Sequence, residues 1–325
     1  MERSGLQFGA AYDIEEASSQ RLREDFETMA RAGMNLVRLG VDRFDREGLV
    51  RLRQAAEVCR ELGLRVILAL PEDGDVPEEL RELPVEAFEI GKSTPPKGME
   101  EEKMVVRTRL ESREDPFGAA GKYTLGCGIF HGAGLKNTGS ELNFQGDLAR
   151  AAAGDNYLVL KTQSQGGLGQ LPFPGQLRLS AFHHLASGAK GLCYWPWHSQ
   201  CAPGSDCQGV IGYDGQPGRA YREISQIGRE FALLGPHLAG LSKSSHIAVL
   251  VSPRSARLMP KIGEKTYEDY LKWVCDSFYR LNIEVDLIPD TCRDFSRYTL
   301  LVTPCLYSPG RELTEAIRDY VTRGG

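Results

Sequence analysis

The sequence predicts an α/β protein in which parallel strands are covered by helices. Short apolar runs alternate with amphipathic helical patterns at the start of the chain, and a strand-helix-strand unit spans Tyr157 to Trp197. A second alternating pattern begins near Ile247. Such alternation with short connections is typical of parallel sheets, because a helix carries the chain back to the start of the next strand. A closed barrel and an open doubly wound sheet both fit this pattern.

The first 70 residues indicate the order β-α-β-α-β. Three apolar runs predict strands: residues 8–12, 35–39 and 65–70. The helix predicted over residues 19–32 carries Leu22, Phe26 and Met29 on one face, and Gly33 follows its end. A second helix lies between the later two strands and ends before Gly63.

The regular alternation stops between residues 72 and 139. Prolines, glycines and the charged run at residues 100–103 dominate this segment, and only residues 104–110 and 123–130 resemble strands. A long segment without regular structure is unusual inside a compact domain. We therefore expect an irregular insert at residues 72–139 and an incomplete set of β-α units.

Polar and aromatic side chains follow the two strands of the later strand-helix-strand unit. The strand at residues 157–160 leads into Lys161 and Gln163, and the strand at residues 191–195 leads into Trp197 and His198. The carboxyl ends of parallel strands lie on one face, where α/β proteins build their sites. Lys161, Gln163, Trp197 and His198 are therefore candidate site residues.

A second unit follows a linker near residues 240–245. Apolar runs at residues 247–251, 284–288 and 299–302 predict strands, and residues 311–322 predict the last helix. The predicted domains are residues 1–240 and residues 246–325. Gly324 and Gly325 resemble a helix end that leads into another strand, so we expect this domain to be truncated at its C-terminus.

Composition excludes several classes of protein. The net charge of -5 gives no electrostatic reason to expect a nucleic-acid partner. No apolar run approaches the roughly 20 residues that cross a bilayer, and the N-terminus lacks an apolar signal, so we expect a cytoplasmic location and no membrane partner. The eight cysteines contain no C-x-x-C pair, and no metal or cofactor is expected. Cys201 and Cys207 could meet across a loop, although reduced thiols are the default expectation in the cytoplasm.

Several segments of the chain resemble the β-galactosidases of glycoside hydrolase family 42. The resemblance covers roughly residues 7–71 and 140–325, through these segments: Phe8-Gly9-Ala10-Ala11-Tyr12, Asn35-Leu36-Val37-Arg38, Pro172-Phe173-Pro174-Gly175-Gln176-Leu177-Arg178-Leu179, Gly188-Ala189-Lys190-Gly191, Tyr194-Trp195-Pro196-Trp197-His198-Ser199, Tyr279-Arg280-Leu281-Asn282-Ile283-Glu284-Val285-Asp286 and Tyr298-Thr299-Leu300-Leu301-Val302-Thr303-Pro304. The resemblance implies a (β/α)8 TIM-type barrel followed by a flavodoxin-like α/β domain, and we expect the barrel to be incomplete here. It also implies a galactoside-type carbohydrate as ligand and a possible homo-trimer.

The family chemistry implied is retaining hydrolysis of terminal β-D-galactosides, which needs two carboxylates. The resemblance places the nucleophile at the end of the seventh strand, where Lys161 stands in place of the glutamate of a Glu-Thr-Gln pattern. The acid/base is implied to be the glutamate of an Asn-Glu pair ending the fourth strand, and the sequence contains no Asn-Glu. The resemblance implies a third carboxylate in the loop after the eighth strand, but Gly204 and Ser205 stand near its place. We therefore expect an impaired catalytic site.

Four further residues are candidates for substrate binding. By resemblance Arg38 would support the nucleophile, and Gln163 follows Lys161 on the same strand end. Of the two aromatic rings Trp195 and Trp197, we expect one to lie in the site and favour Trp197, with His198 bonding a sugar hydroxyl. Two alternatives to hydrolysis stay open. The protein could bind galactosides or act as a scaffold without catalysis, or Lys161 could form a Schiff base with a carbonyl substrate.

Overall fold

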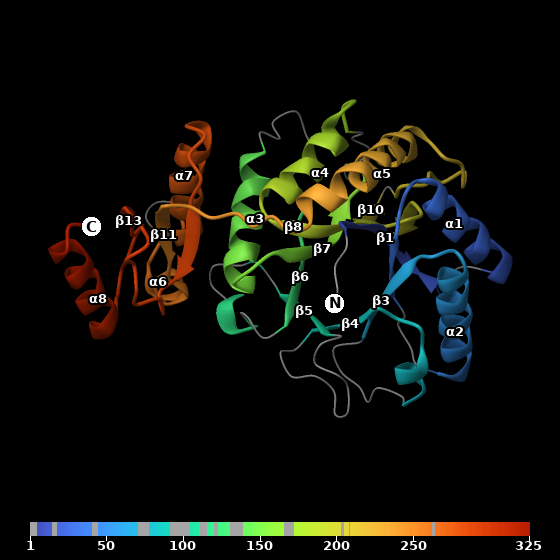
Figure 1. The fold of residues 1–325 in the computed structure, drawn as a ribbon, viewed down its shortest axis with the longest axis horizontal. Helices are drawn as coiled ribbons and strands as arrows, with labels where there is room; N and C mark the ends of the chain where they lie inside the picture. The colour runs from blue at the N-terminus through green and yellow to red at the C-terminus, as the bar shows by residue number, and fades with distance from the viewer. Residues whose placement is uncertain are drawn as a thin grey trace.

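A computed structural model describes residues 5–14, 18–40, 45–70, 78–91, 104–108, 110, 116–119, 123–130, 139–165, 172–202, 205–207, 209–261 and 264–325. These residues form a parallel barrel followed by a smaller α/β domain (Figure 1). The chain order and the sheet order coincide in the barrel, so each new strand is added beside the previous one.

Eight parallel strands close the barrel. They are β1 (Gln7–Asp13), β2 (Leu36–Gly40), β3 (Arg65–Ala69), β4 (Ala87–Ile90), β5 (Met104–Thr108), β6 (Thr124–Gly128), β7 (Tyr157–Gln163) and β8 (Ala189–Trp195). The barrel closes because β8 pairs in parallel with β1, from Gln7 against Gly191 to Ala10 against Tyr194. The predicted TIM-type fold class is therefore confirmed.

The expectation of an irregular insert at residues 72–139 is wrong for residues 87–90, whereas residues 104–110 and 123–130, which resemble strands in the sequence, do contain strands. Residues 87–90, 104–108 and 124–128 are β4, β5 and β6, and they complete the barrel. In the described part of this segment, the elements between strands are the short 3-10 helices η2 (Glu78–Glu82) and η4 (Pro116–Ala119). The strand set is complete, but the helical cover of this side is reduced to 3-10 turns where it is described.

In the described part of the chain, five α-helices cover the outside of the barrel next to strands β1–β3 and β6–β8 (Figure 1). They are α1 (Ser19–Arg31), α2 (Arg46–Glu61), α3 (Ser140–Ala153), α4 (Gln176–Ala186) and α5 (Arg219–Leu238). Side-chain caps begin two of them: the Ser18 side chain accepts from the Arg21 N–H, and Asp45 accepts from the Gly48 N–H. Gly33, with φ of 77°, takes the left-handed conformation after α1 and lets the chain turn into β2.

Two cores fill the barrel region because strand side chains alternate in direction. One core lies between the strands and the helices, with Phe26 and Met29 of α1 and Leu52 of α2 among its buried residues. The other lies inside the barrel and consists of residues from six strands: Leu36, Ile67, Ala87, Val105, Leu158, Leu160 and Cys193. The interior is therefore packed with side chains at mid-height, and polar groups collect beyond it.

The second domain is a three-stranded parallel sheet with helices. Its elements are β11 (Ile247–Val251), α6 (Pro253–Leu258), α7 (Tyr267–Arg280), β12 (Asp286–Pro289), β13 (Leu300–Val302) and α8 (Arg311–Thr322). The sheet order is β12-β11-β13. A capping box, in which Thr266 and Asp269 bond each other's backbone N–H, begins α7. This confirms the predicted α/β character of the C-terminal part.

Helix α3 belongs to both domains. Ala149 and Ala152 pack in the barrel core, whereas Phe144 and Leu148 pack in the core of the second domain. Because both faces are buried, α3 lacks the single apolar stripe of a surface helix. It lies between the barrel and the second domain in Figure 1.

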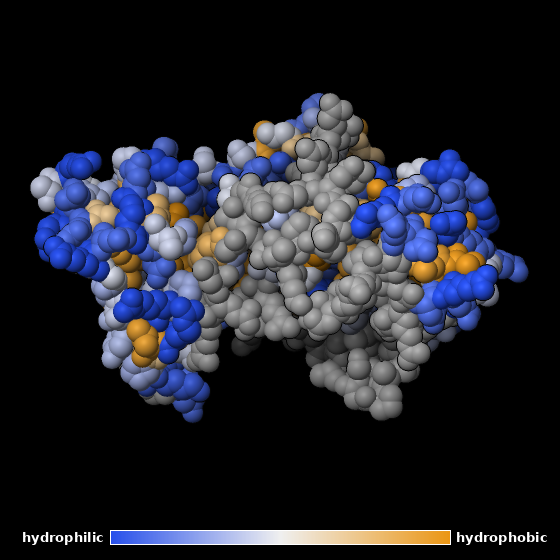
Figure 2. Space-filling view, turned by 90° about the horizontal axis from the view of Figure 1, so that it is seen from below, coloured by the Kyte–Doolittle hydropathy of each residue, from blue (hydrophilic) through white to orange (hydrophobic). Residues whose placement is uncertain are grey.

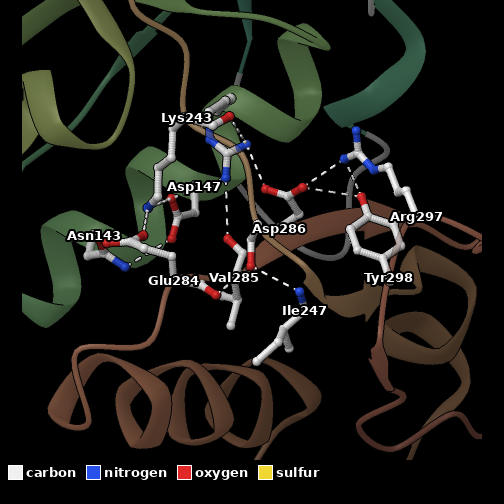
Figure 3. Close-up of polar contacts among 11 residues, drawn as sticks. Asn143, Asp147, Lys243, Ile247, Glu284, Val285, Asp286, Arg297 and Tyr298 are labelled. Atoms are coloured by element: carbon white, nitrogen blue, oxygen red, sulfur yellow. Dashed lines mark hydrogen bonds and ion pairs between the residues drawn. The ribbon is translucent and has the colours of Figure 1, made fainter. Parts of the chain in front are cut away.

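Charged side chains reinforce this junction (Figure 3). Asp147 of α3 accepts from Lys243 Nζ at 2.7 Å and from Asn143 Nδ2 at 2.9 Å. Arg150 donates to Asp286 of β12 at 3.0 Å, and Arg297 donates to the same carboxylate at 2.7 Å. We call these residues, Asn143, Asp147, Arg150, Lys243, Asp286 and Arg297, the junction cluster.

A short hairpin follows β8, formed by β9 (Gln200–Ala202) and β10 (Ser205–Cys207). The expected pairing of Cys201 with Cys207 concerns side chains outside the described part, and Gly204 also lies outside it. Within the described residues, no helix is both long enough and apolar enough to span a membrane. Both ends of the molecule show mainly hydrophilic surface with smaller apolar areas (Figure 2).

Candidate functional site at the barrel mouth

The carboxyl ends of the barrel strands direct four polar or aromatic side chains beyond the apolar interior. Each lies two positions after an interior residue on its strand, so alternation points it to the same side. The pairs are Leu36 with Arg38, Ala87 with Glu89, Val105 with Arg107, and Cys193 with Trp195. These four residues come from β2, β4, β5 and β8 and share the end of the barrel where TIM-type enzymes bind their substrates. We call this end the mouth.

A bulge in β7 decides the position of Lys161. In the pairing of β6 with β7, Cys127 lies opposite Val159 but Gly128 lies opposite Lys161, so β7 has one extra residue there. The pairing with β8 shifts between Val159 and Thr162. An extra residue in one strand reverses the side to which the following side chains point.

The consequence is visible in the side chains around the bulge. Leu160 points into the interior core, and the next residue, Lys161, points to the same side of the strand. Its Nζ lies at the mouth, 5.0 Å from the centre of the Trp195 ring. Thr162 points outward instead, with its hydroxyl 3.5 Å from His184 Nε2. Simple alternation along the strand would have placed Lys161 outside the barrel.

Glu89 is held at the mouth by two arginines. Arg38 donates to it from Nε at 2.5 Å and from a terminal nitrogen at 2.8 Å, and Arg107 donates at 3.1 Å. Glu89 is 1% exposed and Arg38 is 4% exposed. Burial lowers the pKa of Arg38, but the charge and hydrogen bonds of Glu89 outweigh it, so the Arg38 pKa is raised above its usual value. Arg38 and Glu89 therefore form a buried ion pair with two-point geometry.

Lys161 stands in a different environment. Burial lowers its pKa below the usual lysine value, and the positive charge of Arg38 lowers it further, while Asp13 and Glu89 oppose these effects. Its ammonium faces the indole ring of Trp195 as a cation-π contact. Within the described residues, no carboxylate lies at ion-pair distance from Lys161 Nζ.

Trp197 and His198 lie away from the mouth. The strand ends at Trp195, so alternation no longer applies to Trp197, which is buried and donates from Nε1 to Asp25 of α1 at 3.1 Å. His198 Nε2 lies 2.8 Å from Asp25, and its Nδ1 lies 3.2 Å from Arg21. Tyr12 completes this group by donating its hydroxyl to Asp25 at 2.8 Å.

These contacts distinguish the two tryptophans, of which the sequence favoured Trp197 for the site. Trp195 contacts Lys161, whereas Trp197 and His198 fasten the segment after β8 to α1 through Asp25. Burial raises the pKa of Asp25, but the bonds and charge of His198 and the bonds of Trp197 and Tyr12 outweigh it, so this pKa is lowered. We call Tyr12, Asp25, Trp197 and His198 the Asp25 brace.

The remaining expectations concern Arg38 and Gln163. Arg38 reaches the mouth but bonds Glu89 of β4. Gln163 is the last residue of β7 and lies opposite Trp195 in the pairing with β8, so its backbone borders the mouth. In the described part of the chain, no three histidine, cysteine or acidic side chains form a group able to hold a metal ion.

Sequence reasoning missed Glu89 and Arg107. Glu89 is the penultimate residue of the fourth strand, close to where the resemblance implies an acid/base, but Phe88 stands before it instead of asparagine. Arg107 lies in the strand-like residues 104–110, and a period of two from Val105 would have pointed it inward. The signal available for β4 was the short run Ala87 to Ile90, in which Ala87 and Glu89 share one face of a strand.

The fold and the site define a TIM-type barrel protein with a charged mouth and an appended α/β domain. Residues 129–234 match the family described as beta-galactosidase of glycoside hydrolase family 42, and residues 251–325 match the beta-galactosidase trimerisation domain. The chain belongs to glycoside hydrolase family 42.

Curated relatives match over part of their length. Beta-galactosidase BgaH of Haloferax lucentense is 31% identical over 192 residues, which cover 57% of this chain and 28% of the relative. Beta-galactosidase Pbg of Clostridium perfringens is 25% identical over 199 residues, covering 58% of this chain and 29% of that protein. The matched region therefore spans less than a third of each of these relatives.

Solved structures are similar in fold. A beta-galactosidase from Rahnella sp. R3 has a TM-score of 0.82 at 16% identity, covering 100% of this chain and 70% of that one. An exo-beta-1,4-mannosidase from an Opitutaceae bacterium has a TM-score of 0.71 at 14% identity, covering 98% and 76%. At these identities the likeness concerns the fold, which different glycosidases share.

Proposed function

We propose that the barrel mouth binds a β-galactoside and that this chain hydrolyses it far more slowly than a two-carboxylate enzyme does. The observation that carries the proposal is Lys161, which reaches the mouth from β7 and contacts Trp195. Family membership and the names of the curated relatives support the galactoside as ligand. Trp195 provides an aromatic surface of the kind that packs against the C–H face of a sugar.

The chemistry of the mouth explains the expected loss of rate. Retaining hydrolysis requires a carboxylate nucleophile to form a glycosyl ester, and an ammonium group cannot form one. A positive charge at this place also repels the positive charge that develops on the sugar ring in the transition state. Glu89 is the carboxylate that the described mouth retains on β4, and both of its oxygens accept bonds from guanidinium groups. In this arrangement Glu89 acts as a hydrogen-bond acceptor for Arg38 and Arg107.

A direct test compares binding with turnover in the unchanged protein. We expect calorimetry to detect methyl β-galactoside binding, and we expect release of dinitrophenolate from dinitrophenyl β-galactoside to be far slower than with a two-carboxylate enzyme. This substrate needs no acid for its leaving group, so it isolates the missing nucleophile. Turnover by the unchanged chain at the rate of a working glycosidase would contradict the proposal.

Lys161→Glu provides the matched gain-of-function variant. A carboxylate at this position can attack the anomeric carbon while dinitrophenolate leaves, which forms one glycosyl ester per chain. We expect a burst of dinitrophenolate and an intact mass increased by one galactosyl group on residue 161. Lys161→Met, which removes the amine without adding a carboxylate, should show neither signal.

A Schiff base at Lys161 is a second candidate, favoured by the lowered pKa of this lysine. The neutral amine would attack a carbonyl carbon, water would leave, and an imine would join Lys161 to the substrate. Borohydride would reduce that imine to a stable secondary amine. Mass spectrometry of Lys161 after borohydride treatment with galactose, whose open form is an aldehyde, distinguishes this candidate from simple binding.

We also propose that residues 251–325 assemble the chain into a homo-trimer. Their match to the beta-galactosidase trimerisation domain supports this assembly. Analytical ultracentrifugation should give a mass three times that of the 35.9 kDa chain. A monomer at micromolar concentration would contradict it.

A further inference from the structure

The described side chains of the mouth carry more positive than negative charge. Three cations, Arg38, Arg107 and Lys161, face two carboxylates, Glu89 and Asp13. Glu89 is already bonded by both arginines, and Asp13, at the end of β1, is exposed. Among the described residues, the charge of Lys161 is therefore left with an aromatic ring as its contact partner.

A half-buried ammonium without an anion is costly, because it has lost part of its hydration and gained no equal partner. The cation-π contact with Trp195 offsets this only in part, since such contacts contribute roughly 0.5 to 2 kcal/mol. Arg107 adds positive potential at the same place, and one third of its side chain is exposed, in contrast to the buried Arg38. The local electrostatics therefore favour an anion next to Lys161.

We propose that the mouth binds a hexoside carrying a negatively charged substituent, with the Lys161 ammonium pairing with that charge. The ligand class includes uronides, which carry a carboxylate, and sugars esterified with sulfate. The indole of Trp195 borders the same space, so a sugar ring packed against it presents its substituents within reach of Lys161. This inference rests on the proposed function, because it specifies which sugar the mouth prefers.

The preference follows the charge of Lys161. The groups that act on this ammonium are Arg38 and Arg107, which disfavour its charge, and Asp13 and Glu89, which favour it. Because burial and Arg38 lower the pKa of Lys161, it loses its charge at a lower pH than an exposed lysine. We therefore expect the ratio of affinities for anionic and neutral sugars to be highest near pH 6 and to fall as the pH rises toward 10.

Calorimetry at low ionic strength with the full chain tests the inference. The three probes are methyl β-galactoside, methyl β-galacturonide and methyl β-galactoside 6-sulfate. We expect at least one anionic probe to bind about tenfold more tightly than the neutral one, in keeping with a charged hydrogen bond. Preference for the carboxylate alone assigns a uronide, and preference for the sulfate alone assigns a sulfated sugar.

Two variants identify the group responsible. Lys161→Met should abolish the tenfold preference, whereas Lys190→Met should retain it. Lys190 lies at the start of β8, the opposite end of the barrel from the mouth, so this control removes the same charge elsewhere on the same sheet. Thermal unfolding of each variant checks that the barrel is folded.

The outcomes separate the inference from the function on which it rests. Equal affinity for the neutral and anionic probes would overturn the anionic preference and leave galactoside binding intact. A preference that survives Lys161→Met would overturn the role of Lys161. No binding of any probe would overturn both proposals.

Discussion

The mouth and the junction cluster both contain buried carboxylates bonded to cations, yet they differ in how the charges are matched. In the junction cluster, Asp147 accepts from Lys243, and Asp286 accepts from Arg150 and Arg297. At the mouth, Arg38 and Arg107 share Glu89, and Lys161 contacts a ring. The junction uses its charges to join two domains, whereas at the mouth, within the part of the chain that the structure describes, the Lys161 ammonium has no carboxylate at ion-pair distance.

This difference separates structural from functional use of the same chemistry. A buried ion pair whose partners satisfy each other holds elements in place, and removing one partner leaves an uncompensated charge. A cation whose protein neighbours do not neutralise it raises the free energy of the folded state and attracts a ligand of opposite charge. Four measurements follow, in order of decreasing expected effect on stability.

Glu89→Ala is expected to cause the largest loss. It leaves the guanidinium of Arg38, which is 4% exposed, without its carboxylate. Breaking a buried pair in this way costs about 3 to 5 kcal/mol in free energy of unfolding. Urea unfolding followed by tryptophan fluorescence measures it, and a loss below about 1 kcal/mol would show that Glu89 does not hold Arg38.

Lys243→Met and Lys161→Met remove one lysine from each cluster and test the comparison directly. Burial raises the pKa of Asp147, and Lys243 is the main charge opposing this, so its removal should cost about 3 kcal/mol at pH 7. Lys161→Met removes an ammonium that lacks a carboxylate within the described residues, and we expect a change within about 1 kcal/mol. Equal losses in the two variants would remove the distinction between the clusters.

Asp25→Asn tests the brace that fastens Trp197 and His198 to α1. Asp25 accepts three bonds, and an amide in its place turns one acceptor into a donor, so we expect a loss of about 1 to 3 kcal/mol at pH 6. Folding lowers the pKa of Asp25. The Asp25 carboxylate therefore stabilises the folded state above its unfolded-state pKa of about 3.9, and this stabilisation is lost as the pH falls through its folded-state pKa. Denaturant unfolding at several pH values should therefore show the two proteins converging below about pH 4.

The pH dependence of Lys161→Met is the smallest expected effect. A lowered pKa means that the unfolded chain binds the Lys161 proton more tightly than the folded protein does. The stability of the unchanged protein relative to Lys161→Met should therefore rise as the pH increases from 7 toward 10. Urea midpoints of both proteins across this range measure the effect. A fall over the same range would show that Lys161 has an anionic partner.

The sequence predicted the strongly periodic elements well. Strand β11 and helix α8 were predicted at the residues where they lie, because a continuous apolar run marks β11 and apolar residues at helical spacing mark α8. Strand β4 was missed, and β5 and β6 were recognised only as strand-like residues, because all three have four or five residues and lie between polar segments.

The candidate site was predictable where a strand end follows a strong apolar run. Lys161 and Arg38 satisfied this condition, and the structure brings both to the mouth. Glu89 and Arg107 come from the short strands β4 and β5, so the contacts of Glu89 with Arg38 and Arg107 depended on closure of the barrel. The choice between Trp195 and Trp197 depended on where β8 ends and on Asp25, which lies more than 170 residues away along the chain.

The amino-acid sequence by itself determined the α/β class, the succession of most elements and the presence of a lysine where the family resemblance implies a glutamate. These features are local, because periodicity, end signals and residue identity are written within a few neighbouring positions. Only the tertiary structure decided that eight strands close, that a bulge turns Lys161 inward and that Glu89 is neutralised by two arginines. These depend on register and on pairing between distant strands, because a shift of one residue moves a side chain to the other face of a sheet.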